Sequence, residues 1–291
     1  MPSAAAAPSV RALRAAAAAG SVQRLAGELV VLFEHVASLP DKLQWVARQV
    51  SADLQGPRDA ALARAGAAVA SAIDAQPVNF DRLGYHNRQH FCEVALTAYG
   101  LCLLEALSTP ETQLVLLAAL LHDAVHEGRP QAGFVQERAS VESMRGLLQA
   151  AGLDSAQIDR LMVLVLATDT QGGTAFMAAA CRAHAGKDGM PHTPPAGAPE
   201  LAALQGDPRL ARLASLLCEA DVLPSIGLDA GHALRVQQRL AHEWRRPLGR
   251  QDKLAFVDAV LQQGYIGDFF LPGVQAMRAA LSAELHAGTE D

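Results

Sequence analysis

The apolar residues of this chain recur at three- and four-residue spacing over most of its length, as in Leu25, Leu29, Leu32 and Phe33. That period places apolar side chains on one face of an α-helix. No stretch alternates apolar and polar residues convincingly, as a half-buried β-strand would. The spacing therefore predicts an all-α fold, a compact multi-helix domain, with helices over residues 22–38, 41–53, 58–75, 88–107, 110–124, 134–151, 155–168, 208–223, 230–245, 251–262 and 272–286.

Composition divides the chain into three parts. Residues 1–21 are an Ala-rich, low-complexity segment, which we expect to be a frayed tail or a weak helix. We expect residues 22–80 to form an N-terminal helical segment packed on the core, and residues 81–288 to form the main domain. Within that domain, residues 186–207 are rich in Gly, Pro and Ala, which predicts a surface loop.

The charge balance argues against several classes of partner. The chain has 24 Lys plus Arg and 30 Asp plus Glu, a net charge of −6 with histidines neutral. Proteins that coat nucleic acid or bind anionic membranes usually present a basic face, so we expect no nucleic-acid and no membrane partner. The longest apolar stretch, residues 114–121, is also too short to cross a bilayer. With 51% apolar and 19% charged residues, the chain can bury a sizeable core.

The four cysteines indicate a reducing environment. Cys92, Cys102, Cys181 and Cys218 are widely spaced and include no C-x-x-C pair. That pattern fits neither a disulfide framework nor a cysteine zinc site. We therefore expect the protein to be cytoplasmic.

Histidines and acidic residues gather near predicted helix ends. His86 and His90 are four residues apart, as are His122 and His126, so each pair can share a helix face. His122 and Asp123 directly follow an apolar run, and Asp221 follows another. Buried imidazole and carboxylate groups need partners, and a metal ion is one common partner. The plainer alternatives are satisfied polar residues at helix ends and, for Asp221, a helix cap or a buried ion pair.

Five short motifs in a fixed order carry a resemblance to a known family. The chain resembles the class I cyclic nucleotide phosphodiesterases, a branch of the HD-domain phosphohydrolases, over about residues 80–285. Their ordered signature is matched by Tyr85-His86-Asn87-Arg88-Gln89-His90, His122-Asp123-Ala124-Val125-His126-Glu127-Gly128, Ala167-Thr168-Asp169, Ala220-Asp221 and Gln262-Gln263-Gly264-Tyr265-Ile266. The family fold is a compact all-helical domain, which agrees with the periodicity. For residues 81–288, the resemblance implies an HD/PDEase-like catalytic domain.

The resemblance implies a site with two divalent metal ions. His90, His122, Asp123 and Asp221 would ligate the tighter ion, zinc or another transition metal such as manganese or iron. Asp123 would bridge to a second ion, magnesium or manganese, held mainly by waters. His86 would be the general acid that protonates the leaving oxygen after hydroxide, generated between the ions, attacks phosphorus.

Further site residues follow from the same resemblance. His126 would lie behind the metal ligands, and Asp169 would line the metal pocket. Glu142 is the candidate for the carboxylate that orients the histidines, with Glu137 as its rival. For the substrate, Gln262 would hydrogen-bond the base, and Tyr265 stands where the family has a phenylalanine that stacks on it.

Three positions depart from the family pattern. Pro224 stands where nucleotide-reading members often carry Asn, which removes a likely contact to the base. Gln131 replaces an Asn and Glu93 replaces an Asp, both chemically mild changes.

The function implied by the resemblance is hydrolysis of a small-molecule substrate, a 3′,5′-cyclic nucleotide, to a nucleoside 5′-monophosphate in signal transduction. One alternative is an HD phosphohydrolase that acts on another phosphoester, such as a nucleoside monophosphate. The other is a non-catalytic nucleotide sensor.

Overall fold

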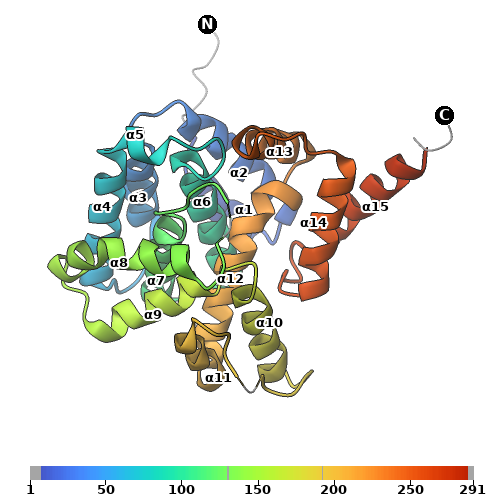
Figure 1. The fold of residues 1–291 in the computed structure, drawn as a ribbon. Helices are drawn as coiled ribbons and strands as arrows, with labels where there is room; N and C mark the ends of the chain where they lie inside the picture. Colours follow the sequence, from blue (N-terminus) through green and yellow to red (C-terminus); the bar gives the residue numbers. More distant parts are fainter. Residues whose placement is uncertain (1–7, 130, 192, 288–291) are drawn as a thin grey trace, which may run out of the picture.

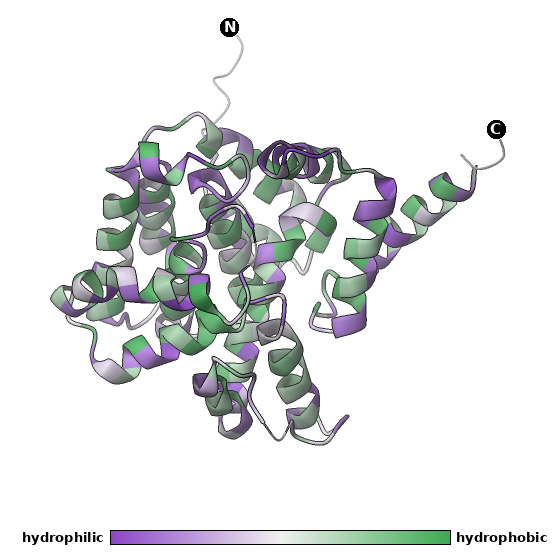
Figure 2. Cartoon of the chain, in the orientation of Figure 1, coloured by the Kyte–Doolittle hydropathy of each residue, from purple (hydrophilic) through white to green (hydrophobic). Residues whose placement is uncertain are grey.

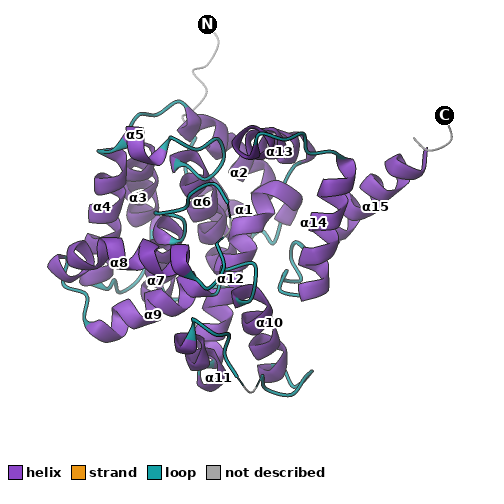
Figure 3. Ribbon diagram, in the orientation of Figure 1, coloured by secondary structure: helices purple, strands orange, loops and turns teal. Residues whose placement is uncertain are grey.

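The computed structural model describes residues 8–129, 131–191 and 193–287, and within these ranges every regular element is a helix (Figures 1 and 3). The predicted all-α fold is confirmed. The elements are α1 Arg11–Ala18, α2 Val22–Ala37, α3 Lys42–Asp53, α4 Ala60–Asp74, α5 Pro77–Phe80, α6 Arg88–Leu104, α7 Thr109–Leu121, α8 Val135–Ala150, α9 Ser155–Leu166, α10 Gly173–His184, the 3₁₀ helix η1 Pro199–Ala202, α11 Ala203–Gly206, α12 Pro208–Ile226, α13 Ala230–Trp244, α14 Arg250–Gln263 and α15 Leu271–Ala287.

Side-chain caps fix where several helices begin. Ser108 and Glu111 form a capping box at the start of α7, in which the Glu111 carboxylate accepts the Ser108 backbone N–H at 3.0 Å. Asp154 caps α9 in the same way through the Gln157 backbone N–H at 2.8 Å. Just before it, Gly152 adopts a left-handed φ of +94°, which ends the preceding turn at no steric cost. Local polar chemistry thus sets the helix boundaries near those predicted.

The core is built around α6 and α12, which cross at the centre of the molecule (Figure 1). Both helices are buried on nearly all sides, because α1, α2, α3 and α7 pack on α6 while α7, α9, α10 and α13 pack on α12. Coloured by hydropathy, the surface helix α13 is largely hydrophilic, whereas α12 is more apolar (Figure 2). Polar side chains on α6 and α12 therefore face other protein groups, and these two helices carry part of the candidate site.

The structure has a helix in the Ala-rich segment, for which the sequence left a frayed tail or a weak helix open, and adds helices where the sequence predicted a loop. In the Ala-rich segment, α1 packs on α2 and α6 with Leu13 buried, and its Arg14 donates to the Asp53 carboxylate at 2.8 Å. Residues 1–7 of that segment lie outside the described ranges. The 186–207 segment contains η1 and α11, because Leu201 and Leu204 are buried against the core. Two further helices, α5 and α10, were not expected either.

No helix in the described part of the chain is long and apolar enough to cross a membrane.

Candidate metal and catalytic site

The start of α6 positions the first two histidines. Asn87 is the N-cap, and its side-chain oxygen accepts the backbone N–H groups of Gln89 at 3.0 Å and His90 at 3.3 Å. Its amide nitrogen donates to the carbonyls of Leu83 and Gly84, which fixes the incoming loop. His86 and His90 are therefore held one turn apart at a helix end whose backbone groups are satisfied.

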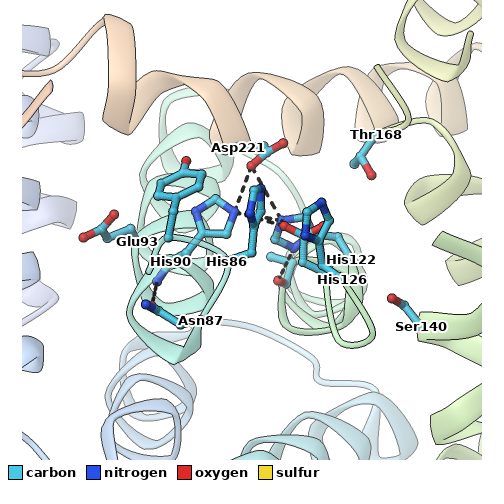
Figure 4. Close-up of polar contacts among 12 residues, drawn as sticks. His86, Asn87, His90, Glu93, His122, His126, Ser140, Thr168 and Asp221 are labelled. Carbon is cyan, nitrogen blue, oxygen red and sulfur yellow. Dashed lines mark hydrogen bonds and ion pairs between the residues drawn. The ribbon is translucent and has the colours of Figure 1, made fainter. Parts of the chain in front are cut away.

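Four ligand-type atoms from three helices converge beside α6 (Figure 4). His90 Nε2 lies 3.2 Å from His122 Nε2, 3.3 Å from Asp123 Oδ2 and 3.2 Å from Asp221 Oδ1. His122 Nε2 in turn lies 3.2 Å from Asp123 Oδ2 and 3.6 Å from Asp221 Oδ1. His90 belongs to α6, His122 and Asp123 directly follow α7, and Asp221 belongs to α12. Three separate parts of the chain therefore contribute to one cluster.

Five of the six separations among these four atoms lie between 3.2 and 3.6 Å, and His90, His122 and Asp221 form a group that could hold a metal ion. Four ligands at tetrahedral corners, each about 2.0–2.1 Å from zinc, lie about 3.3 Å from one another. In addition, His122 Nδ1 is 2.9 Å from the Ala119 carbonyl, which can only accept, so Nδ1 carries the proton. The neutral ring then presents the Nε2 lone pair to the cluster. Mixed imidazole and carboxylate donors suit zinc, manganese or iron.

Without an ion, the cluster must hold protons. Burial alone would lower the pKa of His90, but its contacts with Asp123 and Asp221 outweigh burial and raise it. The same carboxylates raise the pKa of His122 well above its ordinary value against the effect of burial. Conversely, burial would raise the pKa of each carboxyl, yet the two histidines lower both. A metal cation can replace that proton charge.

A second group of titratable residues adjoins the cluster. His86 Nδ1 lies 2.6 Å from Glu243 Oε1, and the other oxygen of Glu243 accepts the backbone N–H groups of Tyr85 and His86. Burial alone would raise the pKa of Glu243, but these hydrogen bonds lower it. The His86 ring stacks on His126 with centroids 3.7 Å apart. Glu243 therefore fixes the orientation of His86 from α13.

His126 behaves as a neutral partner in this group. Its Nδ1 accepts the backbone N–H of Gly128 at 2.9 Å, so that nitrogen is unprotonated. Burial lowers the pKa of His126 to about 4. A cavity of about 480 Å³ is lined by His86, Asp123 and His126 together with residues of α4, α5 and α8. Small molecules thus have space beside both groups.

The expectation that Glu142 orients the histidines is wrong. Glu142 lies on the exposed side of α8, where its carboxylate is held by Arg145 at 2.6 and 2.7 Å. Glu243, which takes the position against His86, is 157 residues away in sequence. No motif in the sequence marks Glu243: it lies just before Arg245 and Arg246, a pair typical of a solvated helix end.

The rival carboxylate, Glu137, lies near the metal cluster. Its Oε2 atom is buried and makes no hydrogen bond among the described residues. Burial and the charges of Asp169 and Asp123 raise the pKa of Glu137 to about 7. Asp169 itself is buried, and its Oδ1 accepts hydrogen bonds from the backbone N–H groups of residues 171–173. Asp169 thus shapes the loop after α9, within electrostatic range of Glu137.

The two predicted substrate residues lie at the end of α14 and just beyond it. Gln262 is exposed, and no hydrogen bond of its side chain occurs among the described residues. Tyr265 is buried, and burial together with the nearby charges of Cys218 and Asp221 raises its pKa well above the ordinary value. The Ser215 hydroxyl of α12 donates to the Tyr265 backbone carbonyl at 3.4 Å, so Tyr265 packs against α12. Pro224 is buried within α12, one turn beyond Asp221.

Comparison with known proteins gives a likeness of fold. No protein-family model matches the chain, and no curated protein sequence matches it. Among solved structures, it is similar to the phosphodiesterase domain of the RhoPDE fusion protein from the choanoflagellate Salpingoeca rosetta, with a TM-score of 0.53, 18% identity and coverage of 91% of this chain and 92% of that one. It is also similar to LmjPDEB1 in complex with IBMX, with a TM-score of 0.54, 15% identity and coverage of 88% of each chain.

A third solved structure, the phosphodiesterase domain of Salpingoeca rosetta rhodopsin phosphodiesterase, has a similar fold. Its TM-score is 0.52 at 18% identity, with 77% of this chain and 82% of that chain covered. At such identities the likeness concerns the fold, and it extends over most of both chains. The chain therefore has the all-helical fold of these phosphodiesterase domains, as the ordered sequence motifs predicted.

Proposed function

We propose that this protein is a metal-dependent phosphodiesterase, with a 3′,5′-cyclic nucleotide as substrate and a nucleoside 5′-monophosphate as product. The observation that carries the proposal is the convergence of His90, His122 and Asp221, with Asp123 in contact with both histidines and with His86 and Glu243 in an adjacent group. The fold likeness to phosphodiesterase domains supports it. The four free cysteines are in keeping with a cytoplasmic role in signalling.

The four clustered residues would hold the tighter ion, zinc or another transition metal, and Asp123 would share a second one, magnesium or manganese. Ions bound there lower the pKa of a water molecule and offset negative charge on phosphate oxygens. Glu137, a buried carboxyl near Asp123 with a pKa of about 7, can accept or donate a proton near neutral pH. His122 is kept in the correct tautomer by the Ala119 carbonyl.

His86 would supply the proton for the leaving oxygen. Opening a cyclic diester expels an alkoxide, and a protonated imidazole lowers that barrier by donating to it. Glu243 stabilises the protonated ring at 2.6 Å and leaves the other ring nitrogen, Nε2, free to donate. Stacking on His126 limits rotation of the ring. This arrangement resembles that of a general acid positioned by a carboxylate.

Recognition of the base rests on Gln262 and Tyr265. A glutamine amide can both donate and accept at the edge of a purine, and an aromatic ring can cover its face. Exposed Gln262 is accessible to a ligand, and buried Tyr265 packs against α12, the helix that carries Asp221. Pro224 offers no side-chain hydrogen bond at the position where nucleotide-reading relatives often use Asn. That substitution favours the alternative, a phosphohydrolase that acts on another phosphoester.

A substrate panel tests the proposal. The purified protein would be assayed with manganese or magnesium against cyclic adenosine and guanosine monophosphates, nucleoside 5′-monophosphates and a base-free diester. We expect a cyclic nucleotide to be cleaved fastest. Gln262→Ala should then raise KM for it by an amount worth about 1–3 kcal/mol and leave the base-free diester unchanged. Preference for a monophosphate would support the alternative, and inactivity on every substrate would support a sensor.

Glu243→Gln should lower kcat by about 10–100-fold, because an amide forms a weaker hydrogen bond to His86 Nδ1 than a carboxylate does and orients the ring less firmly. The amide oxygen can still accept the backbone N–H groups, so the fold should be retained. Glu142→Gln is the matched control, since that exposed carboxylate contacts Arg145 instead. An unchanged kcat for Glu243→Gln, or an equal loss in both variants, would contradict the assignment.

A further inference from the structure

A second cavity, of about 550 Å³, lies between α2, α6 and α13. None of the four proposed metal ligands lines it. It adjoins the candidate site through Arg239, whose guanidinium lies 5.7 Å above the ring of Tyr85, while the same ring packs 4.5 Å from the ring of His90. The cavity is therefore separate from the candidate site, but one of its walls is formed by α13, the helix that carries Glu243.

The floor of this cavity is a buried ion pair that is already satisfied. Glu93 is 1% exposed and accepts two hydrogen bonds from Arg239, at 3.0 and 2.8 Å, and one from Gln89 Nε2 at 3.0 Å. Although burial by itself would raise the pKa of Glu93, His232 and Arg239 lower it to about 2. The carboxylate is thus charged and fully engaged with protein groups.

Two other side chains in the cavity wall have polar atoms with no partner. Gln89 Oε1 is buried and accepts no hydrogen bond among the described residues. His232 is 4% exposed; its Nε2 forms an ion pair with Glu93 Oε2 at 3.6 Å, whereas its Nδ1 has no hydrogen-bond partner among the described residues. Leaving such atoms unpaired costs free energy, and most buried polar atoms in proteins have a partner. Two unpaired atoms, Gln89 Oε1 and His232 Nδ1, in the wall of one cavity point to a ligand.

The surrounding charges define the class of that ligand. Arg239 is neutralised by Glu93, and Arg235 is paired with Glu34 at 3.2 Å, so the cavity holds no uncompensated charge among these groups. Gln89 Oε1 requires a hydrogen-bond donor, and His232 requires a further polar group. Phe33 lines the same cavity as an apolar surface. An uncharged molecule with an N–H donor, a carbonyl acceptor and an apolar face meets all three requirements.

We propose that this cavity is a second small-molecule site, which takes an uncharged lactam or carboxamide between Gln89 and His232. Its volume is in the range of ordinary small-molecule sites. The ligand chemistry has two sources, a free heterocyclic base with a lactam edge and a primary carboxamide, and uracil and nicotinamide represent them. The proposal goes beyond phosphodiester hydrolysis, because binding here needs neither a metal ion nor turnover.

Calorimetric titration of the full chain with uracil, nicotinamide and acetate tests this proposal. Ala37, the last residue of α2, is exposed and lines the cavity, so Ala37→Trp should fill it without disturbing the core. Ala150→Trp, at the exposed last residue of α8, is the matched control. We expect uracil or nicotinamide to bind the wild type and Ala150→Trp with millimolar affinity or better, and Ala37→Trp at least about tenfold more weakly.

The probe that binds identifies the source of the ligand. His232→Phe keeps an aromatic ring beside Phe33, whose centroid is 5.0 Å away, but removes both nitrogens, so it should also weaken binding. The proposal fails if neither probe binds the wild type, if Ala37→Trp binds as well as Ala150→Trp, or if acetate binds in place of the neutral probes. Because the titration measures no catalysis, it can fail while the phosphodiesterase assay succeeds, and the reverse.

Discussion

Asp221→Asn should abolish tight metal binding and with it phosphodiester hydrolysis, whereas Asp207→Asn should change neither. Both residues belong to α12 or its cap, and both substitutions remove one negative charge at nearly constant volume. Asp221 contributes a carboxylate oxygen 3.2 Å from His90 Nε2. Asp207 instead caps the other end of the helix through the Leu210 backbone N–H at 2.8 Å, a task that Asn performs equally well. Elemental analysis of the purified proteins gives the metal content directly.

Thermal unfolding provides a second measurement that does not depend on activity. A ligand present at about 100 times its Kd stabilises the folded state by about 2.7 kcal/mol, which corresponds to roughly 4–5 °C in Tm for a chain of this size. A chelator should therefore lower the Tm of the wild type and of Asp207→Asn by about that amount, and should leave Asp221→Asn nearly unaffected. Equal metal content and equal response to chelator in all three proteins would overturn the metal assignment.

Helical periodicity was sufficient to predict most of the fold, because a buried helix face imposes its period on the sequence wherever the helix is long. It was insufficient where packing, and not local pattern, makes the helix. The Ala-rich α1 has little apolar surface, yet Leu13 is buried and Arg14 bonds both Asp53 and the Tyr99 hydroxyl. Those partners lie 39 and 85 residues away, so no local window contains the information.

The candidate site also contains residues that local sequence patterns predict and residues that only long-range packing brings into place. The cluster of His90, His122, Asp123 and Asp221 could be predicted because these residues lie in short motifs, and the structure places their side chains in contact with one another around the two histidines. The carboxylate that contacts His86 could not be predicted, because Glu243 reaches His86 only through the packing of α13. The choice between Glu137 and Glu142 was, however, accessible from periodicity. Glu137 is four residues before buried Val141, on the inner face of α8, whereas Glu142 faces Arg145 on the outer face.

His86→Ala should retain the metal and lose turnover of a cyclic nucleotide by roughly 10²–10⁴-fold, the usual contribution of a general acid. The loss should shrink on an activated aryl phosphodiester, because an aryl oxide leaves with little protonation. His35→Ala is a suitable control, since that ring contacts Trp45 and none of the site residues. Metal content separates this result from ligand loss, because His86 pairs with Glu243 and is absent from the four-residue cluster. If His86→Ala slows alkyl and aryl diesters by the same factor with its metal intact, His86 positions the substrate and does not donate the proton.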